Sequence, residues 1–272
     1  DLCGRFVPHQ FLSFLGYESI VEVKLGDAVQ KEMSILFSDI RSFTNLSETM
    51  TPDDNFKFIN GYLKRMEPAI ENNNGFIDKY IGDAIMALFG GTADDAVKAG
   101  INMLQLLNEY NTTRQRPERP PISIGIGINT GSLILGIVGG ANRISGTVIS
   151  DAVNLASRIE SLTKIYGVSL LISHNTFLQL NNHENYKIRL IDKVQVKGKL
   201  EFVTLFEVFD GDSPEVREGK LATRNLLERA ILCYNMKRFK EGAFLCEECL
   251  KITPWDKVPR IYLERCQSGA GF

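Results

Sequence analysis

The chain has 272 residues, 44% hydrophobic and 24% charged, enough for a sizeable core in one large domain or in one domain plus an appendage. Its formal net charge is −2, and the lack of a basic field argues against nucleic acid as a partner. The apolar runs have strand length, so no segment is predicted to cross a bilayer, and no signal peptide is visible.

Cysteines are absent from the middle of the chain. Cys3 stands near the start, and the other four are Cys233, Cys246, Cys249 and Cys266. This excludes a disulfide framework for the central part and favours a cytoplasmic, reducing setting, whether or not the full-length protein is anchored to a membrane. Cys246 and Cys249 form a single CxxC pair, which we interpret as two small buried residues on a helical face rather than half of a metal site.

The first thirty residues have a pattern of their own. Phe11, Leu12, Phe14 and Leu15 recur at helical spacing, and Gly26-Asp27 breaks the pattern. The chain begins at Asp1 rather than at Met, so we expect residues 1–30 to be a linker from an upstream sensor or regulatory domain.

Strand and helix patterns then alternate. An apolar run predicts a buried strand over Met33–Ile40, and helical periodicity extends from Pro52 to Asn72. Pro52 falls in the first turn, where its missing N–H costs nothing. Two strands, Gly75–Tyr80 and Ala84–Phe89, joined tightly through Ile81-Gly82-Asp83, predict a hairpin.

The alternation continues to residue 209. The predicted elements are a helix over Asp94–Tyr110, a strand pair over Ile122–Asn129 and Leu133–Val138 around Thr130-Gly131, a helix over Asp151–Thr163 with Asp151 as its N-cap, and strands over Val168–Ile172, Ile188–Val196 and Phe202–Phe209. This order predicts an α/β fold, an α+β sandwich of one central sheet with helices over one face.

After residue 210 the strand signal stops. Val216–Arg265 is predicted to be helical, and the offsets of Tyr234, Phe239, Leu250 and Pro254 weakly resemble a tetratricopeptide helix pair. A single repeat cannot bury its own face, so it must pack on the main domain, on a dimer mate or on further repeats. We therefore divide the chain into a linker (1–30), a main domain (31–210) and a helical tail (211–272).

Two segments place a carboxylate at the end of a strand. Asp39 ends a buried strand and precedes Arg41-Ser42-Phe43-Thr44, which would aim a carboxylate at a metal and backbone N–H groups at phosphate. Asp83 lies at the hairpin tip, where Gly82 leaves room for close approach, and two adjacent carboxylates could hold two divalent ions. The simpler alternatives are a helix-capping Asp and an ordinary β-turn.

A third segment puts an amide and a guanidinium on one helical face. Asn154 and Arg158 are four residues apart, so they can present an amide to a sugar and a guanidinium to a phosphate. As a bare pair this signal is weak, because exposed Asn and Arg residues are common.

Together the three segments resemble the class III adenylyl and guanylyl cyclases. The resemblance covers roughly Glu32–Val208 and includes Gly127-Ile128-Asn129-Thr130-Gly131 and Val196-Lys197-Gly198-Lys199, in the family's order and spacing. It implies the ferredoxin-like cyclase catalytic fold, dimerised head to tail with active sites at the interface. The N-terminal linker and the all-helical C-terminal appendage lie outside the resemblance.

The resemblance also assigns roles at the metal site. Asp39 and Asp83 match the two metal-binding aspartates, with the carbonyl of Ile40 as an added ligand, and the implied cofactors are two divalent ions, Mg²⁺ or Mn²⁺. Phe43 and Thr44, at the start of the following helix, are assigned to substrate binding.

The nucleotide contacts follow from the same match. Lys79 and Thr147 match the pair that reads the purine, Asn154 the amide that orients the ribose, Arg158 the arginine at the reacting phosphate, and Lys197 the lysine on the distal phosphates. Gly125 departs from the pattern, because some relatives place a phosphate-binding arginine near it. In the family the metal aspartates come from one subunit and the other residues from its partner, which implies a homodimer with two complete sites.

Base specificity can be argued from the residue types. Lys79 is donor-only and suits N1 of adenine, while the Thr147 hydroxyl can accept from the adenine amine. We therefore expect an adenylate cyclase that converts ATP to 3′,5′-cyclic AMP and pyrophosphate. The alternatives are a guanylyl cyclase, a palm-type phosphodiesterase or polymerase, and a non-catalytic nucleotide sensor; the GG[DE][DE]F tip of diguanylate cyclases is absent.

Overall fold

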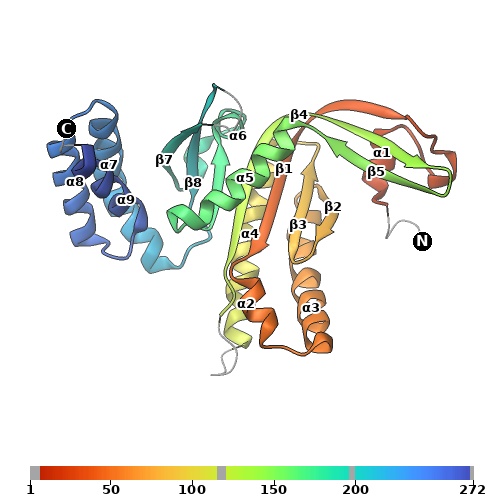
Figure 1. Ribbon diagram of the computed structural model, residues 1–272, viewed down its shortest axis with the longest axis horizontal. Helices are drawn as coiled ribbons and strands as arrows, with labels where there is room; N and C mark the ends of the chain where they lie inside the picture. Colours follow the sequence, from red (N-terminus) through yellow and green to blue (C-terminus); the bar gives the residue numbers. More distant parts are fainter. Residues whose placement is uncertain (1–6, 115–120, 196–199, 270–272) are drawn as a thin grey trace.

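The computed structural model describes residues 7–114, 121–195 and 200–269, and Figure 1 gives its arrangement. Its centre is an eight-stranded sheet in the order β2-β3-β1-β4-β6-β8-β7, with β5 paired to β4. The strands are β1 (Ala28–Ile40), β2 (Gly75–Ile81), β3 (Ala84–Phe89), β4 (Ile124–Gly140), β5 (Arg143–Ile149), β6 (Leu170–Ser173), β7 (Ile188–Gln195) and β8 (Phe202–Val208). The helices are α1 (His9–Phe14), α2 (Phe43–Glu48), α3 (Pro52–Glu71), α4 (Ala93–Thr113), α5 (Asp151–Tyr166), α6 (His174–Leu178), α7 (Pro214–Asn235), α8 (Phe239–Ile252) and α9 (Lys257–Gly269), with 3-10 turns η2 (Ile20–Glu22) and η3 (His183–Asn185).

The long strands β1 and β4 form the middle of the sheet. They pair antiparallel from Ala28 opposite Gly136 to Ile40 opposite Ile124. Side chains alternate along β1, so Leu36 packs into the core on one face of the sheet and Ile35 into the core on the other. The predicted strand over Met33–Ile40 is the mostly buried second half of β1, and the residues before it alternate between exposed and half-buried.

Helices cover both faces of the sheet, and the prediction that they cover one face is wrong. The amphipathic helices α3 and α4 bury Tyr62 and Val97 against one face. Helix α5 lies on the opposite face, and a Cβ built on Gly127 of β4 would come 2.2 Å from the backbone nitrogen of Glu160. Strand alternation cannot reveal this arrangement, because the first half of β4 alternates isoleucine on one face with Gly125, Gly127 and Asn129 on the other.

Strand β4 also corrects the prediction of two strands meeting at Thr130-Gly131. The chain stays extended there, with Thr130 opposite Ser34 and Gly131 opposite Met33. Gly131 allows α5 to approach, since a Cβ at that position would lie 2.9 Å from the Cβ of Ala152. The small residues that suggested a turn instead allow α5 to pack closely on β4.

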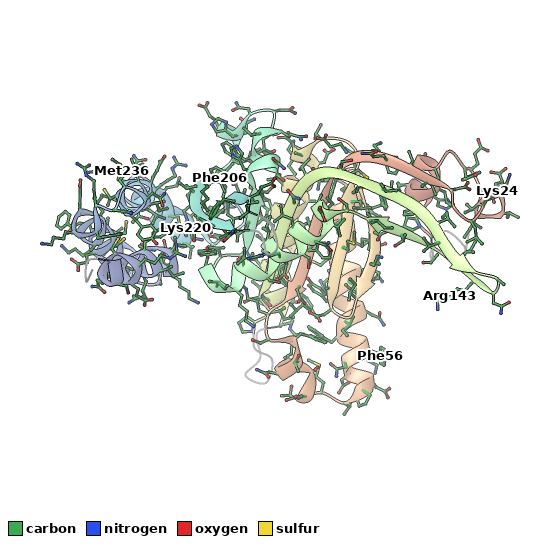
Figure 2. The ribbon with its side chains drawn as sticks, turned by 45° about the horizontal axis from the view of Figure 1, so that its top comes forward. Lys24, Phe56, Arg143, Phe206, Lys220 and Met236 are labelled. Carbon is green, nitrogen blue, oxygen red and sulfur yellow. The ribbon has the colours of Figure 1, made fainter. Side chains whose placement is uncertain are left out.

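The strand β5 has no counterpart among the predicted elements. It pairs with the second half of β4, from Ile149 opposite Ile134 to Arg143 opposite Gly140, and extends the sheet into a long arm. In Figure 2, Arg143 marks the tip of this arm, far from Phe56 at the lower end of α3. Phe11 of α1 is buried against the arm, and a Cβ on Gly146 would meet its ring at 2.9 Å.

The hairpin and helix starts follow the sequence closely. The strands β2 and β3 form the expected hairpin, and Pro52 stands in the first turn of α3. The helix α5 differs in one detail: its N-cap is Ser150, whose hydroxyl accepts from Ala152 N–H, and Asp151 is the first helical residue. Asp151 therefore favours the helix through the dipole rather than as the cap.

The tail consists of α7, α8 and α9, which pack on the main sheet. They share one core with β6, β7, β8 and α5, in which Leu205 and Tyr262 are buried. The Tyr262 hydroxyl donates to the Ile191 carbonyl at 2.7 Å. The tail therefore packs on this chain's own main domain, one of the three partners that the sequence left open. The limits of the linker and of the domains remain predictions.

A buried group of five charged residues, here called the tail network, joins the tail to the sheet. Arg189 of β7 donates to Glu207 of β8 and, at 2.6 and 3.2 Å, to Asp256 before α9. Lys220 of α7 donates to Glu207 and to Asp212. All except Asp212 are at most 5% exposed, so the tail is attached by polar pairs as well as by apolar packing.

The cysteines of the tail are free and buried. Cys233, Cys246, Cys249 and Cys266 lie among the three helices. Burial raises the pKa of Cys246 to about 12 and that of Cys249 to about 11, so both thiols stay neutral and unreactive. They act as small hydrophobic residues, as the sequence predicted.

A membrane-spanning helix was not expected from the sequence. Among the described residues, no helix combines the length and apolar character needed to cross a bilayer.

Candidate active site

The two predicted metal-binding aspartates lie next to one another. Asp39 is the penultimate residue of β1, and Asp83 lies in the turn between β2 and β3. The strand β3 pairs with β1, which brings this turn beside the end of β1. The backbone N–H of Ile40 donates to the Asp83 carboxylate at 3.0 Å. Gly82 takes a left-handed conformation, φ 62°, which lets the tip turn tightly toward the end of β1.

The electrostatics of this pair favour a cation. Partial burial, reinforced by the adjoining Asp83 carboxyl group and by Glu160, raises the pKa of Asp39 to about 7. A divalent ion bound there would offset the repulsion between the carboxylates, and carboxylate oxygens suit Mg²⁺ or Mn²⁺. The donor set therefore fits the metals that the resemblance implies.

The rest of a metal shell would come from other groups. Within the described ranges, no cluster of three or more acidic, histidine or cysteine side chains could hold an ion by itself. Mg²⁺ commonly takes one or two carboxylates and completes its shell with water and substrate phosphates. The pair Asp39 and Asp83, with a backbone carbonyl such as that of Ile40, matches this kind of substrate-completed site.

A third carboxylate, Glu160 of α5, also belongs to this region, and sequence reasoning missed it. Burial raises the pKa of Glu160 to about 7, while the Arg41 guanidinium acts in the opposite sense. Arg41 also donates to the Val168 carbonyl. Glu160 could have been found from its place six residues after Asn154 on the same helix, but only if the close packing of α5 on β4 had been known.

The departure at Gly125 has a steric explanation. Gly125 lies opposite Asp39 on β4, and a Cβ there would come 2.3 Å from Thr163 Oγ1 and 2.9 Å from Glu160 Oε1. An arginine cannot be accommodated at this position while α5 lies where it does. Gly125 therefore cannot be replaced by a larger residue without moving α5.

The segment after β1 turns sharply into α2. Ser42 adopts φ 55°, a left-handed conformation, and Phe43 and Thr44 form the first turn of this six-residue helix. The Phe43 ring stacks on Phe58 with 6.3 Å between centroids, and its half-buried side chain packs against the core. The Thr44 side chain is exposed.

Lys79 lies on the edge strand β2, opposite Met86 of β3. Its side chain is 42% exposed, and its ammonium lies 3.5 Å from the carboxylate of Asp78, whose side chain is only 4% exposed. Lys79 is therefore accessible to a ligand and held near one buried carboxylate.

Thr147 lies at the far end of the sheet from the aspartates. It pairs with Gly136 of β4, which pairs with Ala28 of β1, whereas Asp39 pairs with Gly125. Ala28 and Asp39 are eleven positions apart, roughly 36 Å along the strand at ~3.3 Å per residue. One chain therefore does not bring Thr147 to its own aspartates.

Asn154 and Arg158 share a face of α5, as predicted, but that face points away from the sheet. The opposite side of the helix, at Ala156 and Glu160, packs on Gly127 of β4. Two residues along a helix correspond to a rotation of about 200°, so Asn154 faces outward, and it is exposed. Lys197 lies outside the described residues.

The sequence matches one family over most of its length. Residues 27–207 match the family described as the adenylate and guanylate cyclase catalytic domain. The chain is 48% identical over 214 residues to an adenylate cyclase from Anabaena cylindrica, and the matched stretch covers 76% of this chain and 43% of that protein. It is 40% identical over 272 residues to the terminal-differentiation specific adenylate cyclase of Dictyostelium discoideum, covering 98% of this chain and 13% of that protein.

Solved structures share the fold. The adenylyl cyclase CyaB from P. aeruginosa is 32% identical, with a TM-score of 0.57 over 66% of this chain and 95% of that one. The guanylyl cyclase Cya2 is also 32% identical, with a TM-score of 0.58 over 66% of this chain and 93% of that one. The chain thus spans less than half the length of the two curated relatives above and nearly all of the two solved chains.

Proposed function

Because the chain belongs to the adenylate and guanylate cyclase catalytic-domain family, we propose that it converts ATP to 3′,5′-cyclic AMP and pyrophosphate. The adjacent carboxylates of Asp39 and Asp83 carry this proposal, because they form an oxygen-rich site suited to divalent ions where β1 ends beside the turn between β2 and β3. The relatives named above as adenylate cyclases support the choice of reaction.

The reaction is an internal displacement. The ribose 3′-oxygen forms a bond to the α-phosphorus, the bond from that phosphorus to the bridging oxygen of the β-phosphate breaks, and pyrophosphate leaves. The proton of the 3′-hydroxyl passes to solvent or to a substrate phosphate. Two divalent ions, when bound, would lower the pKa of the 3′-hydroxyl and offset the charge of the triphosphate.

The chain's own residues would mainly position the substrate and stabilise charge. We assign Asn154 to the ribose and Arg158 to the charge that develops at the reacting phosphate. Lys197 is assigned to the distal phosphates, and Thr44 and the backbone of Phe43 to substrate binding near the metal. No histidine or glutamate is needed as a dedicated base.

We propose that two copies of the chain share each site. Asp39 and Asp83 would come from one copy, and the partner would supply Lys79, Thr147, Asn154, Arg158 and Lys197. This division is supported by the roughly 36 Å of strand between Asp39 and the level of Thr147, and by the outward face of Asn154. A symmetric pair of chains would then contain two complete sites.

We propose ATP rather than GTP as the substrate. Lys79 can only donate, which matches the acceptor at N1 of adenine and opposes the donor at N1 of guanine. A Lys79→Glu variant should lose most of its ATP turnover, without full GTP activity unless Thr147 also changes.

The test is to incubate the chain with ATP or GTP and Mg²⁺ or Mn²⁺, to identify the product and to compare kcat/KM for the two nucleotides. Cyclic AMP as the product, with kcat/KM favouring ATP, supports the proposal. A kcat/KM ratio near one or favouring GTP would show that the base assignment is wrong. The absence of any cyclic nucleotide from a dimeric preparation would refute the activity itself.

A further inference from the structure

Asp78 is a buried carboxylate beside the proposed base-reading lysine. Its side chain is 4% exposed, and its Oδ2 atom is fully buried and has no hydrogen-bond partner among the described residues. A buried charge without partners is strongly unfavourable, so a buried carboxylate that stays ionised needs a neighbouring positive charge.

That neighbouring charge is Lys79. The Lys79 ammonium lies 3.5 Å from Asp78 Oδ2, and no other ion pair joins either residue to a described side chain. Burial raises the pKa of Asp78, and the positive charge of Lys79 opposes this rise. The Lys79 side chain is 42% exposed, so its ammonium can reach a ligand while it stays close to the buried Asp78 carboxylate.

The strand geometry explains how neighbouring residues can form this pair. In a regular strand, consecutive side chains point to opposite faces. In β2 the register shifts, because Ile77 pairs with Ala87 while Lys79 pairs with the next residue back, Met86. Asp78 is thus the extra residue of a β-bulge, a feature that redirects side chains locally.

We propose that Asp78 is a positioning residue for Lys79, whose buried carboxylate holds the ammonium at the place from which it donates to N1 of adenine. Asp78 acts through Lys79 and need not touch the nucleotide. This inference rests on the proposed function, because it deepens the base-reading role given to Lys79. It makes adenine selectivity a property of the pair rather than of the lysine alone.

The consequence is a specific loss of adenine affinity when Asp78 loses its charge. In Asp78→Asn the side chain keeps its shape, but Lys79 is free to move into solvent. Binding of 3′-deoxy-ATP, which cannot cyclise, should weaken about tenfold, as expected when one charge-assisted contact is lost. Binding of 3′-deoxy-GTP should change little, because Lys79 does not assist that base.

The experiment is a double-mutant cycle measured by calorimetric titration of both analogues in Mg²⁺. It uses the parent, Asp78→Asn, Lys79→Met and the double variant, with Asp53→Asn, an exposed aspartate at the start of α3, as the matched control. We expect Asp78→Asn to weaken 3′-deoxy-ATP binding in the parent background only. Equal weakening in the Lys79→Met background, or no weakening at all, would overturn the proposal.

Thermal unfolding gives a readout that does not depend on nucleotide. Lys79→Met leaves a buried carboxylate uncompensated and should lower Tm, and adding Asp78→Asn should recover part of the loss. If Asp78→Asn alone does not fold, Asp78→Glu replaces it, and retention of most of the preference for 3′-deoxy-ATP is expected because the charge remains. Loss of that preference in a stable Asp78→Glu dimer, or additive Tm changes in the cycle, would contradict the pairing.

The Lys79→Met variant shows whether base reading by Lys79 or only the positioning role of Asp78 has failed. If Lys79→Met leaves the discrimination between the two analogues intact, Lys79 does not read the base, and the role of Asp78 falls with it. If Lys79→Met abolishes the discrimination but Asp78→Asn does not alter it, base reading stands and only the positioning role is refuted.

Discussion

Replacing Asp39 by Asn should inactivate the chain and yet stabilise it when metal is absent. The reason is the pKa of Asp39, which partial burial and the neighbouring Asp83 raise from 3.8 to about 7. In the unfolded chain the group releases its proton near pH 4, whereas the folded chain retains it up to about pH 7. Folding stability is therefore lost as pH rises from 4 to 7 and stays lower above pH 7.

The size of this effect can be bounded. The difference between the two pKa values corresponds to about 4 kcal/mol, at ~1.36 kcal/mol per pH unit. Asp39 is partly exposed, so solvent screening reduces this to about 1–2 kcal/mol. Asp39→Asn carries no charge and should gain that amount at pH 8, with the gain shrinking to nothing near pH 4.

The assay is urea unfolding followed by circular dichroism, with EDTA present, at several pH values between 4 and 8. Asp53→Asn serves as a control for the amide substitution. Adding Mg²⁺ should stabilise the parent more than Asp39→Asn, because only the parent keeps both carboxylates for the ion. A variant less stable than the parent at pH 8 in EDTA, or a gain that does not depend on pH, would refute the reasoning.

Three further outcomes are expected. Mixing the inactive Asp39→Ala and Arg158→Ala chains should restore about a quarter of the parent activity, since half of the randomly formed dimers contain one intact site; heterodimers without activity would contradict the shared site. Arg189→Met should cost about 3–5 kcal/mol in urea unfolding because it leaves buried Asp256 without its ion pair and Glu207 with Lys220 alone, whereas the exposed control Arg229→Met should cost less than about 0.5 kcal/mol. A chain ending at residue 210 exposes the core around Leu205 and should melt at a lower temperature, so an unchanged Tm would show that the tail adds no stability.

The order of elements could be predicted because the strands and helices of the main domain have clear periods. The hairpin around Gly82 and the helix that starts at Pro52 follow from local signals alone. The single strand β4 and the arm strand β5 could not be predicted, because Thr130-Gly131 and Gly146 resemble turn residues. Their smallness instead serves packing against α5 and α1, which is visible only in three dimensions.

In the candidate site, too, some residues could be predicted from the sequence and others could not. The adjacency of Asp39 and Asp83 was expected from the sequence, because both stand at the ends of strands in matching segments. The contribution of Glu160 depends on the distance between α5 and β4, which one sequence does not encode in any local pattern. The roles assigned to Lys79, Thr147, Asn154, Arg158 and Lys197 stay predictions, and so does the tail as a separate unit.

The contact between Phe11 and Gly146 has a consequence for how related sequences can vary. Gly146 precedes Thr147, and any larger side chain there would displace the aromatic ring of α1. Sequences with an aromatic residue at position 11 are therefore expected to keep glycine at position 146, while those that lack the helix are free to change it. The two positions should covary, and a family alignment showing independent substitution would mean that α1 sits elsewhere in those relatives.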